Sequence, residues 1–92
     1  MEPRQICVRF WASARAAAGT DALTVSVAGA EPTVADVRRA VLAALPDRAE
    51  LPRVLGVCSV VLGERPMGAA DAERVAVPAG TDLEFLPPFA GG

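Results

Sequence analysis

The side chains that most often carry catalysis are missing from this chain of 92 residues. It has no histidine and no tyrosine, and all nine of its basic residues are arginine, so lysine is absent as well. These absences exclude a histidine-dependent triad, a Schiff-base enzyme and a phosphate loop with its lysine. Two cysteines without histidine also cannot supply the four ligands of a structural zinc site, so we expect no bound metal. We therefore expect the chain not to be an enzyme by itself.

The two cysteines, Cys7 and Cys58, are too few for a disulfide framework. Each lies in an apolar, β-branched stretch of sequence. In such surroundings a free cysteine usually packs as a small buried hydrophobic side chain and does not react. We expect both cysteines to be structural.

A main-chain group, the carboxylate of Gly92, is left as the candidate for chemistry. Glycine has no Cβ, so a Gly-Gly tail can enter a narrow channel and reach a partner's active site. Two prolines stiffen the base of the tail and direct it away from the body of the protein. We expect residues 87–92 to form a flexible tail with Gly92 as the reactive group, which an enzyme must activate. The residues that would thread the channel are Pro87, Pro88, Phe89, Ala90 and Gly91.

Alternation of apolar and polar residues predicts the strands that must hold this tail. The predicted strands cover residues 6–11, 23–27, 57–62 and 83–86, with a short edge strand at 74–77. On the first and last strands, the residues predicted to face inward are Ile6, Val8, Phe10, Leu83 and Phe85.

The clearest predicted helix begins after Thr33, which forms a capping-box pattern with Asp36, and Pro46 ends it. Its apolar face comprises Val34, Val37, Val41, Leu42 and Leu45. The alanine-rich segment 12–18 predicts a short helical turn that stops at Gly19. Residues 47–53 are predicted to be a polar connection with at most one helical turn.

This order of elements predicts a single domain, 1–92, of the α+β class. The smallest architecture that fits is a β-grasp, or ubiquitin-like, roll: a mixed sheet of four to five strands with one main helix packed on one face. Its first and last strands would lie side by side and parallel at the centre.

Charge and sequence pattern also predict where in the cell the protein occurs, and they argue against nucleic acid and membranes as partners. A net charge of −2 and a pI near 5.0 argue against nucleic acid as a partner. Arg9 and Arg15 interrupt the apolar stretch 6–18, so it does not predict a membrane span. Residues 1–5 show no signal-peptide pattern, and we expect a cytoplasmic protein.

Three segments of the chain resemble the sulfur-carrier family, and within it the small subunit of molybdopterin synthase. The first is Val8-Arg9-Phe10-Trp11-Ala12-Ser13-Ala14-Arg15 with the following Gly19, and the second is the helix entry Pro32-Thr33-Val34. The third, and the most specific, is Leu86-Pro87-Pro88-Phe89-Ala90-Gly91-Gly92. The stretch 65–74 is longer than is usual in that family.

The resemblance implies a mechanism that needs no catalytic side chain in this protein. A ubiquitin-activating-type enzyme would adenylate the Gly92 carboxylate with ATP, and sulfur transfer would convert it to a thiocarboxylate. The tail would then enter the large catalytic subunit of molybdopterin synthase, as part of a hetero-oligomer, and donate sulfur to a pterin precursor. No cofactor would be bound to the chain itself.

The outer face of the sheet predicts a partner surface beside the tail. Arg9 and Trp11 point away from the core on the first strand, as Leu86 does on the last. Trp11 and Leu86 would form an apolar patch surrounded by charge, and tryptophan and arginine are enriched at interfaces. For Arg15, pairing with a partner carboxylate and simple exposure on the short helix both remain open.

Three other functions remain open. The chain could be a sulfur carrier for thiamine or cysteine biosynthesis, or a ubiquitin-like modifier conjugated to protein lysines. It could also be a plain β-grasp binding module with an incidental tail.

Overall fold

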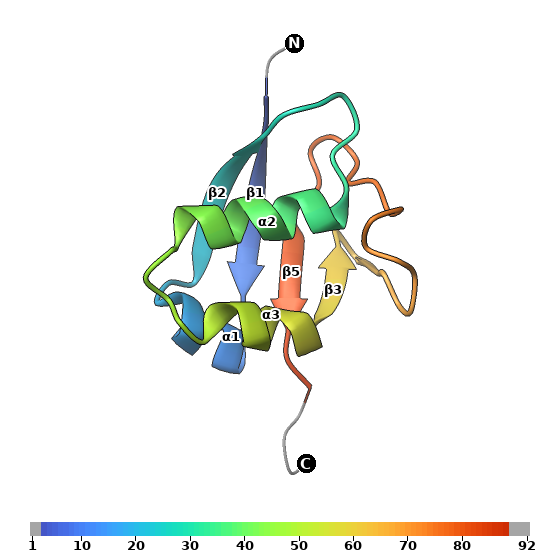
Figure 1. Ribbon diagram of the computed structural model, residues 1–92. Helices are drawn as coiled ribbons and strands as arrows, with labels where there is room; N and C mark the ends of the chain where they lie inside the picture. Colours follow the sequence, from blue (N-terminus) through green and yellow to red (C-terminus); the bar gives the residue numbers. More distant parts are fainter. Residues whose placement is uncertain (1–2, 89–92) are drawn as a thin grey trace.

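A five-stranded mixed sheet with helices on one side forms the body of the protein (Figure 1). The computed structural model describes residues 3–88. The elements in chain order are β1 (Arg4–Phe10), α1 (Ala12–Ala18), β2 (Ala22–Val27), α2 (Val34–Ala44), α3 (Leu51–Val57), β3 (Ser59–Leu62), β4 (Arg65–Pro66) and β5 (Leu83–Leu86). The strand order is β2-β1-β5-β3-β4. This is the predicted ubiquitin-like β-grasp arrangement.

The first and last strands lie side by side and parallel, as the sequence predicts. Val8 pairs with Leu83, and Phe10 pairs with Phe85. β1 is antiparallel to β2, and β3 is antiparallel to both β4 and β5. β5 therefore lies between two strands, and the position at which the chain leaves it is fixed by pairing on both sides.

α2 crosses one face of the sheet and buries its apolar side against it (Figure 1). Val34, Val37 and Val41 are fully buried, whereas the predicted face residues Leu42 and Leu45 are only half-buried. The predicted inward residues of β1 and β5 are all buried as well. At the centre of the core the rings of Phe10 and Phe85 stack, with centroids 6.1 Å apart.

The predicted helix boundaries are confirmed at three points. The Thr33 hydroxyl accepts a hydrogen bond from the Asp36 backbone N–H at 3.1 Å, and the Asp36 carboxylate accepts one from the Thr33 N–H at 2.9 Å. α2 ends at Ala44, just before Pro46. α1 ends at Gly19, which has the left-handed conformation with φ of 77°.

The predicted polar connection is wrong, and the predicted strand 57–62 begins two residues later than expected. Residues 51–57 form helix α3, where the sequence predicted a polar connection followed by a strand from Val57. β3 begins only at Ser59, and Val57 is the exposed last residue of the helix. The buried side of α3 consists of Leu51, Val54 and Leu55, which have helical spacing.

The predicted edge strand at 74–77 is also wrong, because only Ala76 pairs there, in a single bridge with Thr33. The edge position next to β3 belongs to β4, which follows a turn at Gly63 and Glu64. The sheet ends before Pro87, as predicted. The remaining tail positions, Phe89, Ala90, Gly91 and Gly92, lie outside the described residues.

Candidate functional site

Trp11 lies at the end of β1 and is exposed over 49% of its surface. Its backbone N–H donates to the carbonyl of Phe85 at 3.2 Å, so the contact between β1 and β5 continues to this residue. Its carbonyl accepts from the Ala14 N–H at 2.9 Å and begins α1. Ala12, the first residue of α1, has a φ of 48°, which turns the chain sharply there. Trp11 is therefore held by its backbone while its ring faces outward.

A hydrogen bond fixes the indole ring over β5. Trp11 Nε1 donates to Glu84 Oε1 at 2.8 Å. Glu84 is the register partner of Arg9, and it alternates with the buried Leu83 and Phe85 along its strand. The outer face of the two central strands thus carries an aromatic ring whose polar edge is bonded and whose apolar surface remains accessible.

Arg9 and Arg15 lie around the same ring. Arg9 pairs with Asp82 at 3.7 Å, and Arg15 with Asp21 at 3.7 Å. All four side chains of these pairs are at least half exposed, so the pairs contribute little stability and can exchange for a partner's carboxylates. Arg9, Trp11 and Arg15 also line one small recess of about 170 Å³. The structure thus brings together three of the predicted partner residues.

Leu86, the fourth predicted partner residue, is not part of this recess. It is half-buried on the outer face of β5, opposite Ser59 of β3. Val57, the last residue of α3, is exposed over 60% of its surface just before β3. The sequence predicted it to lie in a strand. An exposed apolar side chain therefore follows β1 and another precedes β3, and these two strands flank the end of β5 from which Pro87 and Pro88 continue.

The cysteines are half-buried and do not bond to each other. The Cys58 thiol donates to the Val54 carbonyl at 3.2 Å. Burial raises the pKa of Cys58 to about 11, so it is a neutral thiol at physiological pH and a poor nucleophile. Cys7 lies on the outer face of β1, opposite Thr24.

Two features are absent from the described residues, a metal site and a membrane-spanning helix. Between Pro3 and Pro88, no group of three or more cysteine, aspartate or glutamate side chains is placed to hold a metal ion. No helix in this part of the chain is both long enough and apolar enough to cross a bilayer.

The fold and the open outer face define a ubiquitin-like β-grasp protein. Neither a model of a known family nor a curated protein sequence matches the chain. Solved structures do match it. The crystal structure of small archaeal modifier protein 1 from Haloferax volcanii superposes with a TM-score of 0.75 at 28% identity, over 96% of this chain and 99% of that one.

Two further structures show the same fold at lower identity. The solution structure of small archaeal modifier protein 1 from Methanosarcina acetivorans has a TM-score of 0.74 and 20% identity over 100% of both chains. A second Haloferax volcanii protein has a TM-score of 0.75 and 24% identity, over 99% of this chain and 89% of that chain. These two likenesses show the fold, and the likeness to the Haloferax modifier supports the general kind of protein that the sequence predicts, a ubiquitin-like carrier or modifier.

Proposed function

We propose that this chain is a ubiquitin-like sulfur carrier whose reactive group is the Gly92 carboxylate. In this proposal it is the small subunit of molybdopterin synthase and delivers sulfur to a pterin precursor. One observation carries the proposal: the paired central strand β5 leads directly into Pro87 and Pro88, beside the exposed ring of Trp11. In this proposal, the surface around Trp11 would bind the partner at the base of the segment that ends in Gly-Gly.

The chemistry follows from the poor reactivity of a carboxylate. An activating enzyme of the ubiquitin-activating type would join the Gly92 carboxylate to the α-phosphate of ATP, releasing pyrophosphate. A sulfur donor equivalent to hydrosulfide would attack the acyl carbon, the bond from that carbon to the phosphate oxygen would break, and AMP would leave with this oxygen and the bonding electrons. The product is a thiocarboxylate, whose sulfur stays nucleophilic at neutral pH. This chain contributes binding and delivery, and its partner enzymes contribute catalysis.

Within the described residues, the properties of the cysteine side chains agree with sulfur being carried on the terminus. Cys58 is bonded to Val54 and has a raised pKa, so it would be a poor carrier of transferable sulfur. Cys7 lies on β1 opposite Thr24, away from the end of β5 where the tail begins.

A second candidate function is conjugation to other proteins as a modifier. The observation that favours it is the 28% identity to a Haloferax volcanii protein named as a modifier. The same adenylate would then be attacked by a lysine amine of a target, giving an amide bond. This chain has no lysine, so chains linked to one another through lysine would not form.

The two functions can be separated in one experiment. The purified chain is incubated with a ubiquitin-activating-type enzyme, ATP and sulfide, and its intact mass is measured. The thiocarboxylated product is then mixed with the large synthase subunit and a pterin precursor. Sulfur appearing in the pterin supports the carrier proposal. If sulfur is gained but not passed on, and an amide to target lysines forms in a cell extract, the modifier function is correct.

A further inference from the structure

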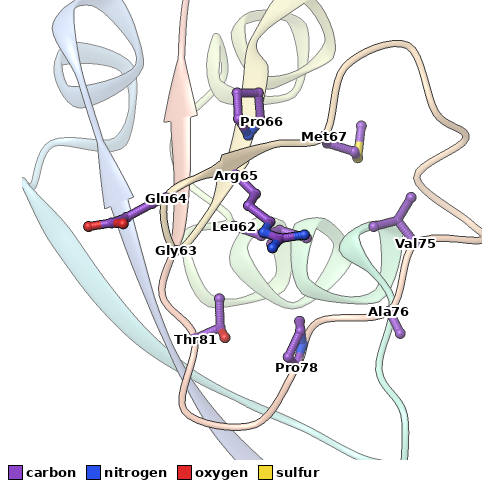
Figure 2. A pocket seen from close by; sticks show the side chains of 10 residues that line it. All are labelled: Leu62, Gly63, Glu64, Arg65, Pro66, Met67, Val75, Ala76, Pro78 and Thr81. Carbon is purple, nitrogen blue, oxygen red and sulfur yellow. The ribbon is translucent and has the colours of Figure 1, made fainter.

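A second recess lies at the opposite end of the sheet from the tail. The turn between β3 and β4 forms one side of it and residues 75–81 form the other (Figure 2). Its volume is about 550 Å³. Leu62 pairs with Leu83 at the start of β5, whereas Ser59 pairs with Leu86 at its end. A ligand in this pocket would therefore leave the tail free to act.

The wall of the pocket is mostly apolar, and one cation enters it. The side chain of Arg65 points into the pocket, whereas that of Glu64 points away (Figure 2). Met67, from the strand side, and Val75, from the opposite loop, are both half-buried and present apolar surface. The apolar wall is completed by Leu62, Pro66, Ala76 and Pro78.

Among the described residues, Arg65 differs from most other arginines because its side chain has no hydrogen-bond or ion-pair partner. Five others form ion pairs, namely Arg9, Arg15, Arg39, Arg53 and Arg74. Arg4 donates to the Val77 carbonyl at 2.7 Å. Within residues 3–88, Arg65 forms neither an ion pair nor a side-chain hydrogen bond. Its charge is therefore available to an anionic group that enters the pocket.

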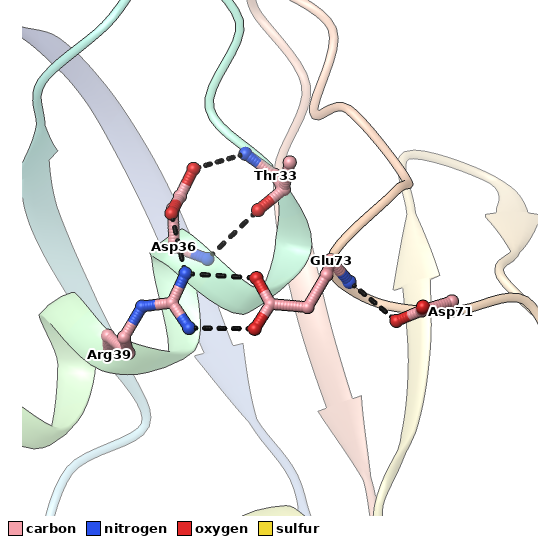
Figure 3. A network of polar contacts seen from close by, with 5 residues as sticks. All are labelled: Thr33, Asp36, Arg39, Asp71 and Glu73. Carbon is pink, nitrogen blue, oxygen red and sulfur yellow. Dashed lines mark hydrogen bonds and ion pairs between the residues drawn. The ribbon is translucent and has the colours of Figure 1, made fainter.

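The loop side of the pocket is held in place from behind. The Val34 N–H donates to the Val75 carbonyl at 2.9 Å, and the Val77 N–H to the Pro32 carbonyl at 2.8 Å. Arg39 of α2 donates to both carboxylate oxygens of Glu73, at 3.0 and 3.1 Å (Figure 3).

The other side of the pocket is part of the sheet, through the pairing of β4 with β3. The pocket is thus formed before any ligand arrives, which lowers the entropy cost of binding.

We infer that this pocket binds an extended segment of a partner protein in which an acidic side chain adjoins one or two apolar side chains. The apolar groups would cover Met67 and Val75 while the carboxylate pairs with Arg65. We expect the segment to bind through its side chains and not as an added strand. The edge strand β4 contains Pro66, which has no N–H with which to pair a further strand. The complementary charge of Arg65 identifies the segment as acidic.

The test uses two probe peptides, acetyl-Ser-Leu-Leu-Glu-Ser-amide and its match with Gln in place of Glu. Each is titrated into isotope-labelled protein, and the Met67 methyl and Val75 amide signals are followed by NMR. We expect saturable changes in NMR chemical shift, largest at these two residues. The Gln peptide should bind about fivefold more weakly, as loss of one partly exposed ion pair predicts.

Arg65→Gln should lower affinity for the Glu peptide about fivefold, to that of the Gln peptide. Arg74→Gln is the matched control, because Arg74 pairs with Asp71 and does not line the pocket. Equal binding of the two peptides, or unchanged binding by Arg65→Gln, would overturn the inference.

Three other results would overturn it as well. The first is shifts centred on Trp11. The second is shifts that grow with protein concentration alone, which would indicate a second copy of the chain. The third is binding of 4-methylpentanoate as tightly as the peptide, which would indicate a site for a small molecule.

Discussion

The indole of Trp11 donates a 2.8 Å hydrogen bond to Glu84, although 73 residues separate them in sequence. The bond crosses the parallel β1–β5 pair and so ties the ring to the strand that leads into the tail. Between exposed groups such a bond contributes little stability, about 1 kcal/mol or less. Its larger effect is to restrict the rotamer of Trp11, so that a partner meets a preorganised anchor.

Trp11→Glu should therefore weaken binding to the large synthase subunit more than it weakens the fold. A central tryptophan anchor typically contributes 2 kcal/mol or more, so we expect a loss of roughly thirtyfold in affinity. Leu86→Glu should act in the same direction, with some loss of stability because Leu86 is half-buried. Calorimetry with the purified subunit measures both affinities.

Ala79→Glu is the control for added charge, because Ala79 is exposed in the turn before β5, at the other end of that strand. It should bind like the original protein. Unchanged affinity in both Trp11→Glu and Leu86→Glu would show that the patch is not the interface.

Sequence alternation was sufficient to assign Arg9 and Trp11 to the outer face of the sheet. It did not identify Glu84 as the bonding partner of Trp11, or Asp82 as the partner of Arg9. Both contacts depend on the register of the parallel pair. That register is set by the packing of Phe10 on Phe85 and by the segments that connect the strands, and no local pattern encodes it.

Two glycine substitutions should change stability in opposite directions. Gly19 has a φ of 77°, a left-handed conformation that is unfavourable for a residue with a Cβ, so Gly19→Ala should cost about 1–2 kcal/mol, while the flexible Arg48 guanidinium beside it can move aside. Gly56 lies inside α3, and a Cβ there would meet no atom within 4 Å. Gly56→Ala should stabilise by roughly 0.5–1 kcal/mol.

Urea denaturation of the two variants measures these changes against a common reference. Equal effects of the two substitutions would contradict both the left-handed cap at Gly19 and the helical state of residues 51–57.

The sequence did not predict helix α3, because the patterns within residues 51–57 indicate different structures. The polar residues that follow Pro46 indicated a connection, and the β-branched run from Val57 indicated a strand. The helical signal was present in the spacing of Leu51, Val54 and Leu55, but it spans barely more than one turn. The structure resolves the conflict because Pro52 is tolerated in the first turn and all three apolar residues reach the core.

Cys58 should react slowly while the protein is folded. Burial raises its pKa from 9.0 to about 11, so near pH 8 its thiolate fraction should be about a hundredfold lower than in the unfolded chain. The stability gained from the buried neutral thiol is present below pH 9 and is lost as the pH rises through 9 to 11. Alkylation by iodoacetamide, followed by mass spectrometry with and without urea, measures the difference.

Cys58→Ser and Cys7→Ser should both still accept sulfur, because neither thiol takes part in the proposed transfer. A variant that stays folded yet gains no sulfur would place the cargo on that cysteine and not on Gly92.

Removal of Gly92 should abolish sulfur transfer and leave stability unchanged. Within residues 3–88 the buried core ends at Phe85 and the last paired residue is Leu86, so we expect folding not to need the final residue. The shortened chain should melt like the intact one but show no exchange of oxygen for sulfur in its intact mass. Gly91→Ala should reduce sulfur transfer less than the removal of Gly92 does. Its methyl group would crowd a narrow channel but leaves the carboxylate in place.

The most discriminating variant adds one residue after Gly92. It keeps a free carboxylate and every residue of the tail, but moves the carboxylate about 3.5 Å past the adenylation site. We expect no adenylate, measured as ATP–pyrophosphate exchange with the activating enzyme, and no gain of sulfur. Because the added residue leaves the folded body unchanged, the extended chain should still bind the activating enzyme in calorimetry, which separates lost docking from lost chemistry. If the extended or the shortened chain still gained sulfur, the terminal carboxylate of Gly92 would not be the carrier.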